Sequence, residues 1–432
     1  MRIRRSFQIS SSIDFERKLF EWAKQYDDII WLESNDHKDR YGAFNSALAV
    51  SSHTGQSRKR IESLDALQHF LSHTQDWLFG YFSYDLKNKW EELDSANIDR
   101  LCFPELSFFQ PQKVILMQND RVTFEYLSDN DQIDKDFEAI SNIDLSPKAS
   151  SQANAHIKIR MRIKKDQYFE KASRLLAHIK RGDVYEVNFC QEFYSENTTI
   201  DPWSTYERLN AISKSPFAAF MKLNQRYLVS ASPERYLRRS GNTLISQPIK
   251  GTAARSVDAQ EDKSLKEELR SNIKERAENI MIADLVRNDL SKNALKGTVE
   301  VAELCGVYSF EQVHQMITTI RCAVAPEKHA LDLIRDTFPM GSMTGAPKVS
   351  AMKLIETHEE TKRGLYSGAL GYFSPSGDFD FNVVIRSILY NAQTAYVSYS
   401  VGSAITAKSN PEHEYQECLL KAKALRQVLE SD

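Results

Sequence analysis

Hydrophobic and polar residues alternate along some segments of this chain and recur every three to four residues in others. From Val184 to Phe193 the apolar and polar side chains take turns, and a period of two predicts a β-strand. Apolar residues at helical spacing between Phe169 and Ile179, followed by Gly182, predict a helix that ends at the glycine.

The same two patterns extend over the rest of the chain. They predict strands at residues 77–84, 227–232, 242–246, 379–390 and 395–401, and helices at residues 265–290, 349–360 and 412–429. Strands and helices come in blocks, which favours an α+β fold with largely antiparallel sheets. A polar, aperiodic stretch at 143–156 predicts a linker between an N-terminal region, 1–145, and a larger region, 156–432.

Composition narrows the classes of function. A chain of 432 residues with 41% hydrophobic residues suits two globular domains or one large layered domain. A net charge of −3 and no apolar run of about 20 residues argue against nucleic-acid and membrane partners. The five cysteines are scattered and form no CxxC pair, which favours a reducing cytoplasm over a disulfide framework.

Lys250 follows a predicted strand at a point where the backbone has to turn. Pro248 cannot continue a central strand, and Gly251 permits backbone conformations that are closed to other residues. A lysine that is buried or close to another cation can act as a nucleophile. The ordinary alternative is a solvated surface lysine beside a turn.

Two pairs of glutamates, Glu275 with Glu278 and Glu414 with Glu417, stand three residues apart in predicted helices. Each pair lies on one helix face, so two such helices could bring four carboxylates together. Carboxylates of this kind suit Mg²⁺, whereas the alternative is two solvated helix faces. His413-Glu414 resembles the start of a zinc-protease motif, but Glu417 stands where that motif needs histidine.

Three further features favour the binding of an anion. The turn-rich stretch from Gly341 to Lys348 leads into a helix, and helix N-termini offer free N–H groups. Gly402 offers backbone N–H groups at a predicted strand end, and Arg386 could clamp a carboxylate through two hydrogen bonds. The residues alone therefore predict a Mg²⁺-dependent site for a small polycarboxylate, with a lysine as candidate nucleophile.

Residues 160–430 also contain an ordered series of motifs that resembles the chorismate-utilising enzymes, which include anthranilate, aminodeoxychorismate, isochorismate and salicylate synthases. The matching runs are Gly182-Asp183-Val184-Tyr185-Glu186-Val187-Asn188, Ser232-Pro233-Glu234-Arg235, Pro248-Ile249-Lys250-Gly251-Thr252, Asp284-Leu285-Val286-Arg287-Asn288-Asp289-Leu290, Thr344-Gly345-Ala346-Pro347-Lys348 and Arg363-Gly364-Leu365-Tyr366-Ser367-Gly368. The resemblance implies a large α+β fold with two packed, mainly antiparallel sheets flanked by helices. It also implies chorismate as substrate and Mg²⁺ as cofactor.

The resemblance also implies a role for each matching position. Glu278 and Glu417 would bind Mg²⁺ directly, with Glu275 and Glu414 holding water. Glu234 would be the general acid that protonates the departing C4 hydroxyl.

Further positions would bind the substrate. Tyr366 and Arg386, helped by the backbone of Gly402, would clamp the enolpyruvyl carboxylate, and His314 would lie near the ring. The motif that contains Thr344, Gly345 and Lys348 is expected to help bind the substrate.

Lys250 favours the aminodeoxychorismate synthase branch, because anthranilate synthases carry alanine at the matching position. The branch implies that the lysine amine attacks C2 of chorismate and that ammonia then displaces it at C4. A separate glutamine amidotransferase subunit would supply the ammonia, and a separate lyase would complete p-aminobenzoate for folate synthesis. The alternatives are anthranilate synthase component I and a non-catalytic subunit that binds chorismate or tryptophan.

This chain departs from the family pattern in three places. Glu186 stands where this branch usually has glutamine and the isochorismate enzymes have lysine. Gly402-Ser403-Ala404 replaces a loop richer in glycine, and residues 408–411 replace a usually acidic run. The sequence leaves open what Glu186 does and whether tryptophan is bound near Leu32-Glu33-Ser34.

Overall fold

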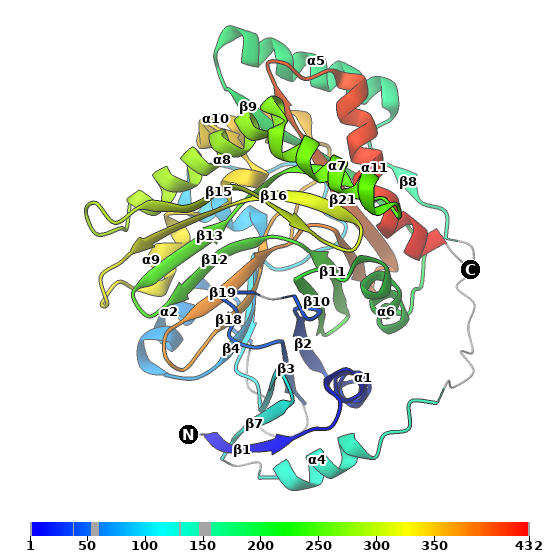
Figure 1. Cartoon of the computed structure of the whole chain (residues 1–432), viewed down its shortest axis with the longest axis vertical. Coiled ribbons are helices and arrows are strands. Elements are labelled where there is room, and N and C mark those ends of the chain that lie inside the picture. The colour runs from blue at the N-terminus through cyan, green and yellow to red at the C-terminus, as the bar shows by residue number, and fades with distance from the viewer. Residues whose placement is uncertain (1, 38, 53–59, 129–130, 147–156, 431–432) are drawn as a thin grey trace.

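Two β-sheets stacked face to face, with helices on their outer faces, make up the protein (Figure 1). This computed structural model describes residues 2–37, 39–52, 60–128, 131–146 and 157–430. All strand pairings between the named strands of these residues are antiparallel, which confirms the predicted α+β class and the two-sheet architecture.

The first sheet has 12 strands among the described residues. In spatial order it comprises β1 (Arg2–Gln8), β7 (Arg121–Leu127), β6 (Lys113–Gln118), β3 (Ser46–Ser51), β2 (Asp28–Glu33), β10 (Phe217–Leu223), β11 (Arg226–Ser232), β20 (Ser387–Asn391), β21 (Tyr396–Thr406), β9 (Glu186–Ser195) and β17 (Gly345–Ala346), with β8 (Arg160–Met161) also paired to β9.

The second sheet has nine strands in the same described part of the chain. They are β14 (Ile249–Ala254), β16 (Val313–Ala323), β13 (Thr243–Gln247), β12 (Arg235–Ser240), β19 (Phe379–Val383), β18 (Ala369–Phe373), β4 (Leu78–Phe82) and β5 (Leu106–Phe109), with β15 (Glu300–Ser309) on the free side of β16.

The helices are α1 (Ser12–Ala23), α2 (Leu64–His73), α3 (Lys87–Trp90), α4 (Ile133–Ser141), α5 (Lys165–Arg181), α6 (Pro202–Ser213), α7 (Ala259–Ser271), α8 (Ile273–Ser291), α9 (Ala330–Arg335), α10 (Lys348–His358) and α11 (Pro411–Glu430). In Figure 1, α7 and α8 lie over β15 and β16, while α5 and α11 lie beside β9 and β21. As predicted, α5 ends at Gly182, which adopts a left-handed conformation with φ of 91°. No helix of the described residues is both long and apolar enough to cross a membrane.

The N-terminal region contributes to both sheets. Its strands β1, β2, β3, β6 and β7 form one end of the first sheet, and β4 and β5 form the edge of the second. Along β3, Ala47 and Ala49 pack into the core between the sheets, while Leu48 and Val50 pack into the core beneath the helices. Of the predicted linker, residues 147–156 lie outside the described residues.

Two of the predicted elements are wrong, because each is interrupted where the chain changes direction. The single strand predicted at 379–390 is two strands, β19 in the second sheet and β20 in the first. Arg386, with φ of 53°, lies at the crossing between them. The single helix predicted at 265–290 is α7 and α8, since the side chain of Asn272 accepts hydrogen bonds from the first backbone N–H groups of α8.

A buried arginine joins segments that are far apart in the sequence. Arg363 donates to both carboxylate oxygens of Glu359, and to the backbone oxygens of Met343 at 2.6 Å and Asn188 at 2.8 Å. Both ionic side chains are almost fully buried. The pair therefore fixes strand β9 against the loop that precedes α10.

We expect Arg363→Met to lower the free energy of unfolding by about 3–5 kcal/mol, because it leaves the Glu359 carboxylate buried and unpaired. Urea denaturation followed by circular dichroism measures this change. Arg174→Met is the control, because Arg174 pairs with Glu170 on the exposed face of α5 and such pairs contribute only about 0.3–0.5 kcal/mol. Equal effects of the two substitutions would contradict the structural role of Arg363.

Candidate active site

Lys250 lies at an irregularity near the start of β14, as the sequence predicts. The pairing of β14 with β16 shifts register between Ile249 and Thr252, and Gly251 has φ of 96°. The side-chain amide of Asn279, on α8, donates to the backbone oxygen of Lys250 at 3.0 Å. The lysine is thus held at a bulge, and its side chain is only 13% exposed.

The ammonium group of Lys250 meets a carboxylate of the opposite sheet. Its Nζ lies 2.9 Å from Oε1 of Glu186, at the start of β9, and the Glu186 side chain is 1% exposed. Burial alone would lower the pKa of Lys250, but the carboxylates of Glu186, Glu278 and Glu417 outweigh burial and raise it above its ordinary value. The lysine therefore rests in its charged form.

Glu234 lies in the turn between β11 and β12 and has the properties of a general acid. Burial raises its pKa to about 7, against the opposing effects of a hydrogen bond from Ser342 at 2.6 Å and of the nearby charge of Lys250. A carboxyl group with this pKa is partly protonated at neutral pH. Ser342 is a partner of Glu234 that the sequence did not predict.

The neighbouring Arg235 fixes the position of this turn. Its guanidinium donates to Asp380 on β19 at 2.9 and 3.0 Å, to Gln247 on β13 at 2.5 Å, and also to Asp39. Successive residues of an extended segment point to opposite sides, so this clamp directs Glu234 the other way.

The two predicted carboxylate pairs converge, because α8 and α11 bring their first turns together. The ammonium of Lys274 lies 3.8 Å from Glu278 and 3.9 Å from Glu414, so it bridges the two helices. Burial raises the pKa of Glu275, and it raises the pKa of Glu278 to about 7. Burial would likewise raise the pKa of Glu417, but the ammonium of Lys421, 2.5 Å away, holds it below the ordinary value.

The four glutamates Glu275, Glu278, Glu414 and Glu417 offer the oxygen ligands that Mg²⁺ prefers, although their carboxylates do not surround a single point in this structure. No group of three or more histidine, cysteine or acidic side chains among the described residues is close enough to hold a metal ion as placed. Glu278 and Glu414 nevertheless lie within 3.9 Å of a shared cation, the Lys274 ammonium, and all four carboxylates raise its pKa against the effect of burial. Hard oxygen ligands of this kind are those that Mg²⁺ prefers. The residues present therefore fit the ion by their chemistry.

A second cationic group lies beside the carboxylates. Arg386 donates to the backbone oxygen of Lys421 at 3.0 Å, and within the described residues it has no carboxylate partner within ion-pair distance. Burial lowers its pKa, while Tyr366 and Glu417 act in the opposite direction. Such an arginine can receive the carboxylate of a ligand.

Gly402 and Lys421 complete this part of the site. The ammonium of Lys421 donates to the backbone oxygen of Gly402 at 2.9 Å as well as pairing with Glu417. A side chain at Gly402 would collide with Cys190 on the adjacent strand, so glycine is required there. The sequence did not predict a role for Lys421, because it is one of the lysines in the last helix.

The predicted motif before α10 contributes structure rather than charge. The hydroxyl of Thr344 donates to the backbone oxygens of Met340 and Gly341, and Gly345 packs against the backbone of Glu186. The ammonium of Lys348 pairs with Asp289 at 2.5 Å. Asp289 lies three turns of α8 beyond Glu278, about 16 Å along the helix axis, so Lys348 is not part of the group around Lys250.

His314 likewise faces away from the space between the sheets. Its ring nitrogens lie 2.9 Å from the hydroxyl of Ser309 and 3.0 Å from the carboxylate of Asp262 on α7. The next residue, Gln315, is buried, pairs with Thr252 of β14, and points to the opposite face of β16. Its Oε1 has no hydrogen-bond partner among the described residues, so Gln315 rather than His314 presents a polar group toward the site.

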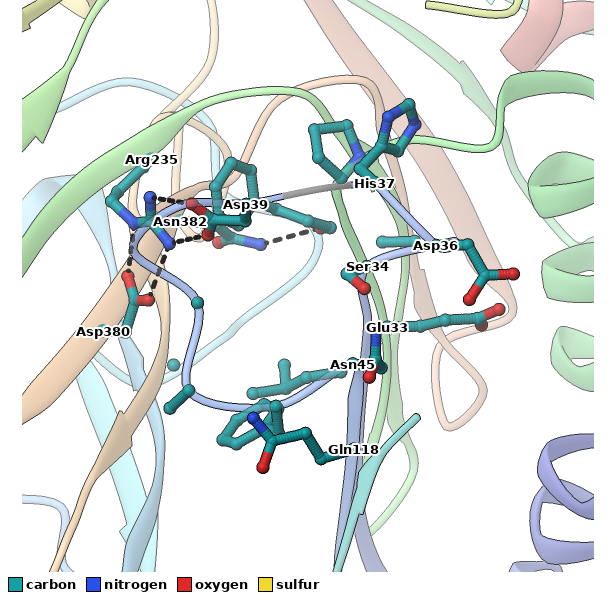
Figure 2. A pocket seen from close by; sticks show the side chains of 18 of the residues that line it. Glu33, Ser34, Asp36, His37, Asp39, Asn45, Gln118, Arg235, Asp380 and Asn382 are labelled. Atoms are coloured by element: carbon teal, nitrogen blue, oxygen red, sulfur yellow. Dashed lines mark hydrogen bonds and ion pairs between the residues drawn. The ribbon is translucent and has the colours of Figure 1, made fainter. Parts of the chain in front are cut away.

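A cavity of about 600 Å³ is lined in part by Arg235, Asp380 and Asn382 (Figure 2). Leu32, Glu33 and Ser34 help to line it, and the Arg235 guanidinium sits between Asp39 and Asp380. Of the described residues that line this cavity, none is one of the four converging glutamates or Lys250. The cavity is therefore a compartment separate from the predicted reaction site.

The chain is similar over most of its length to one family of enzymes and to several of its members. The sequence model of the chorismate binding enzyme family matches residues 27–427. Aminodeoxychorismate synthase component 1 of Escherichia coli (strain K12) is 33% identical over 399 residues, 90% of this chain and 87% of that protein. Anthranilate synthase component 1 of Thermus thermophilus is 33% identical over 357 residues, 81% of this chain and 77% of that protein.

Solved structures show the same fold. Anthranilate synthase component I from Streptococcus pneumoniae superposes with a TM-score of 0.70 and 26% identity, covering 80% of this chain and 79% of that one. The menaquinone-specific isochorismate synthase from Escherichia coli, at 18% identity, superposes with a TM-score of 0.78 over 99% of this chain and 94% of its own. The family match over nearly the whole chain and the converging site residues lead to one conclusion: this protein is an enzyme of the chorismate binding family.

Proposed function

We propose that this enzyme converts chorismate and ammonia to 4-amino-4-deoxychorismate. The observation that carries the proposal is the buried amine of Lys250, coupled by charge to the acid Glu234 and to the carboxylates of α8 and α11. The 33% identity to aminodeoxychorismate synthase component 1 over 90% of the chain supports the same reaction.

In the first half-reaction Lys250, as the free amine, attacks C2 of chorismate while the C4 hydroxyl leaves. Glu234 donates the proton that lets this group depart as water, and its pKa of about 7 keeps the acid form available. The Ser342 hydroxyl orients the Glu234 carboxyl group. The product of this step is a covalent adduct between C2 and the lysine.

In the second half-reaction ammonia attacks C4 and the bond from C2 to Lys250 breaks. The new amino group then occupies the carbon that carried the hydroxyl, because each displacement shifts both double bonds of the ring. Arg386 and Tyr366, with the backbone of Gly402, clamp the enolpyruvyl carboxylate through both steps. We give His314 and Lys348 no contact with the substrate, since other partners engage both side chains.

Mg²⁺ is part of the proposal. Glu278 and Glu417 would hold it directly, and Glu275 and Glu414 through water. When bound, the ion neutralises the C1 carboxylate of the substrate and so favours the attack of a nucleophile at C2. Lys274 would move aside to admit it.

The proposal includes two partner proteins and a location. A separate glutamine amidotransferase would supply ammonia, and an aminodeoxychorismate lyase would convert the product to p-aminobenzoate for folate synthesis. The five unpaired cysteines support a reducing cytoplasm.

Anthranilate synthesis is the second candidate function. Anthranilate synthase component 1 of Thermus thermophilus is as similar in sequence as the aminodeoxychorismate synthase, which favours this alternative. Lys250 argues against it, because direct addition of ammonia at C2 needs no nucleophile from the enzyme. A non-catalytic subunit that binds chorismate or tryptophan is a third candidate, against which the retained glutamates argue.

Incubation of the enzyme with chorismate, Mg²⁺ and ammonium chloride distinguishes these candidates. We expect 4-amino-4-deoxychorismate by chromatography, and p-aminobenzoate only after addition of the lyase. Anthranilate fluorescence without the lyase would exclude our proposal, and unchanged chorismate would favour the non-catalytic subunit.

We expect Lys250→Ala to abolish the covalent adduct that forms with chorismate and Mg²⁺ in the absence of ammonia. Intact-protein mass spectrometry detects the adduct as an added substrate mass less one water. Lys222→Ala is a control on β10, because the Lys222 ammonium is bound by the backbone of Tyr26. An adduct that persists in Lys250→Ala would show that another residue is the nucleophile.

We expect Glu278→Gln and Glu417→Gln each to raise the Mg²⁺ concentration needed for half-maximal chorismate turnover by about 10-fold or more, because a neutral amide is a weaker ligand than a carboxylate. The measurement is a Mg²⁺ titration at saturating chorismate and ammonia. Glu412→Gln, on the exposed first turn of α11, should leave the titration unchanged. Unchanged titrations for Glu278 and Glu417 would remove both residues from the metal site.

A further inference from the structure

Glu186 is buried opposite Lys250, the proposed nucleophile, and its side chain contacts no other polar partner among the described residues. Its Oε1 lies 2.9 Å from Nζ of Lys250, and its side chain is 1% exposed. Apart from this ion pair, neither oxygen of Glu186 has a partner among the described residues. A buried carboxylate is unfavourable without compensation, so this pair holds both charges in place.

The same contact presents a chemical problem. A lysine ammonium has no lone pair and cannot attack carbon, so Lys250 has to lose a proton before it reacts. The negative groups around it oppose that loss, and they raise its pKa above the ordinary value. The carboxylates that act on Lys250 are Glu186 on β9, Glu278 and Glu275 on α8, Glu417 on α11 and Glu234 before β12.

Among the described carboxylates, Glu186 is the one within ion-pair distance of the amine. Glu234 is engaged by Ser342 and is needed as the acid for the leaving hydroxyl. Glu278 and Glu417 belong to the proposed metal site. The geometry therefore leaves Glu186 as the acceptor with a direct path to the Lys250 proton.

We propose that Glu186 accepts the proton that converts Lys250 from ammonium to amine, and returns it when the lysine is released. This inference rests on the proposed function, in which Lys250 is the nucleophile.

The protons and electrons balance over the cycle. A proton moves from Nζ to Oε1 of Glu186, and the Nζ lone pair then bonds to C2 while the C4–O bond breaks and Glu234 protonates the departing hydroxyl. When ammonia adds at C4, the C2–Nζ bond breaks and its electron pair stays on the lysine, which recovers its proton from Glu186. The new C4 ammonium returns a proton to Glu234, so chorismate and ammonia yield the amine and water.

The pH dependence of the reaction distinguishes a Glu186 that accepts the proton from a Glu186 that only positions Lys250. If the proton moves within the pair, the reactive amine forms to the same extent at any pH at which the pair holds one proton. If Glu186 is replaced by glutamine, the proton has to go to solvent, and the fraction of amine then rises about 10-fold per pH unit below the lysine pKa.

The experiment measures the rate of adduct formation by rapid quench and intact-protein mass spectrometry, without ammonia and at saturating chorismate and Mg²⁺. From about pH 5.5 to 6.5 we expect a flat profile for the unmodified enzyme, because Glu234, with a pKa of about 7, stays mostly protonated in this range. We expect Glu186→Gln to form the adduct about 100-fold more slowly at pH 6 and about 10-fold faster for each added pH unit. A flat profile for Glu186→Gln would overturn the proposal.

Two variants separate this role from a loss of folding. Glu186→Asp keeps an internal acceptor, so its rate falls but its profile stays flat; a rising profile would count against the proposal. Glu192→Gln removes a second buried glutamate of β9, paired with Arg162 at 3.0 Å, and should keep a flat profile even if stability falls. If the unmodified enzyme forms no adduct, Lys250 is not the nucleophile and the proposed function is refuted. If the adduct forms and its rate in Glu186→Gln does not change with pH, only the role of Glu186 is refuted.

Discussion

A lysine ammonium enclosed between two sheets is stable only beside a negative group, and the facing sheet supplies one. Lys250 is on β14 of the second sheet and Glu186 on β9 of the first, and their side chains meet at 2.9 Å. The contact depends on the stacking of two sheets whose strands come from distant parts of the chain. The proposed reaction site therefore depends on how the two sheets pack against each other.

The helices bring further charges to the same interface. Asn272 ends α7 and starts α8, so the first two turns of α8, which carry Glu275 and Glu278, begin beside the bulge at Gly251. The carboxylates of α11 come from the C-terminal end of the chain. Lys274 lies between the two helices, so mutual repulsion of the carboxylates is relieved by a cation of the protein itself.

The crossing of the chain between the sheets positions Arg386, the proposed anion-binding group. An uninterrupted strand at 379–390 would keep Arg386 in one sheet, with its side chain on a strand face. The chain instead leaves β19, turns at Arg386 and enters β20 of the other sheet, which directs the guanidinium toward α11. On β19 itself, Asp380 binds Arg235 and so steadies the turn that carries Glu234.

The sequence by itself determined the α+β class, most element positions, the family, the turn at Lys250 and the two carboxylate pairs, because periodicity, glycine, proline and short motifs act locally. Only the tertiary structure decided which side chains meet. Neighbouring residues of a strand point to opposite faces of the sheet, which is why Gln315 rather than His314 points into the space between the sheets. The sequence motif predicts that Lys348 binds an anion, but in the folded protein its ammonium pairs with Asp289. The Lys250–Glu186 pair joins residues 64 positions apart, and its distance is set by the packing of the two sheets, which no local pattern encodes.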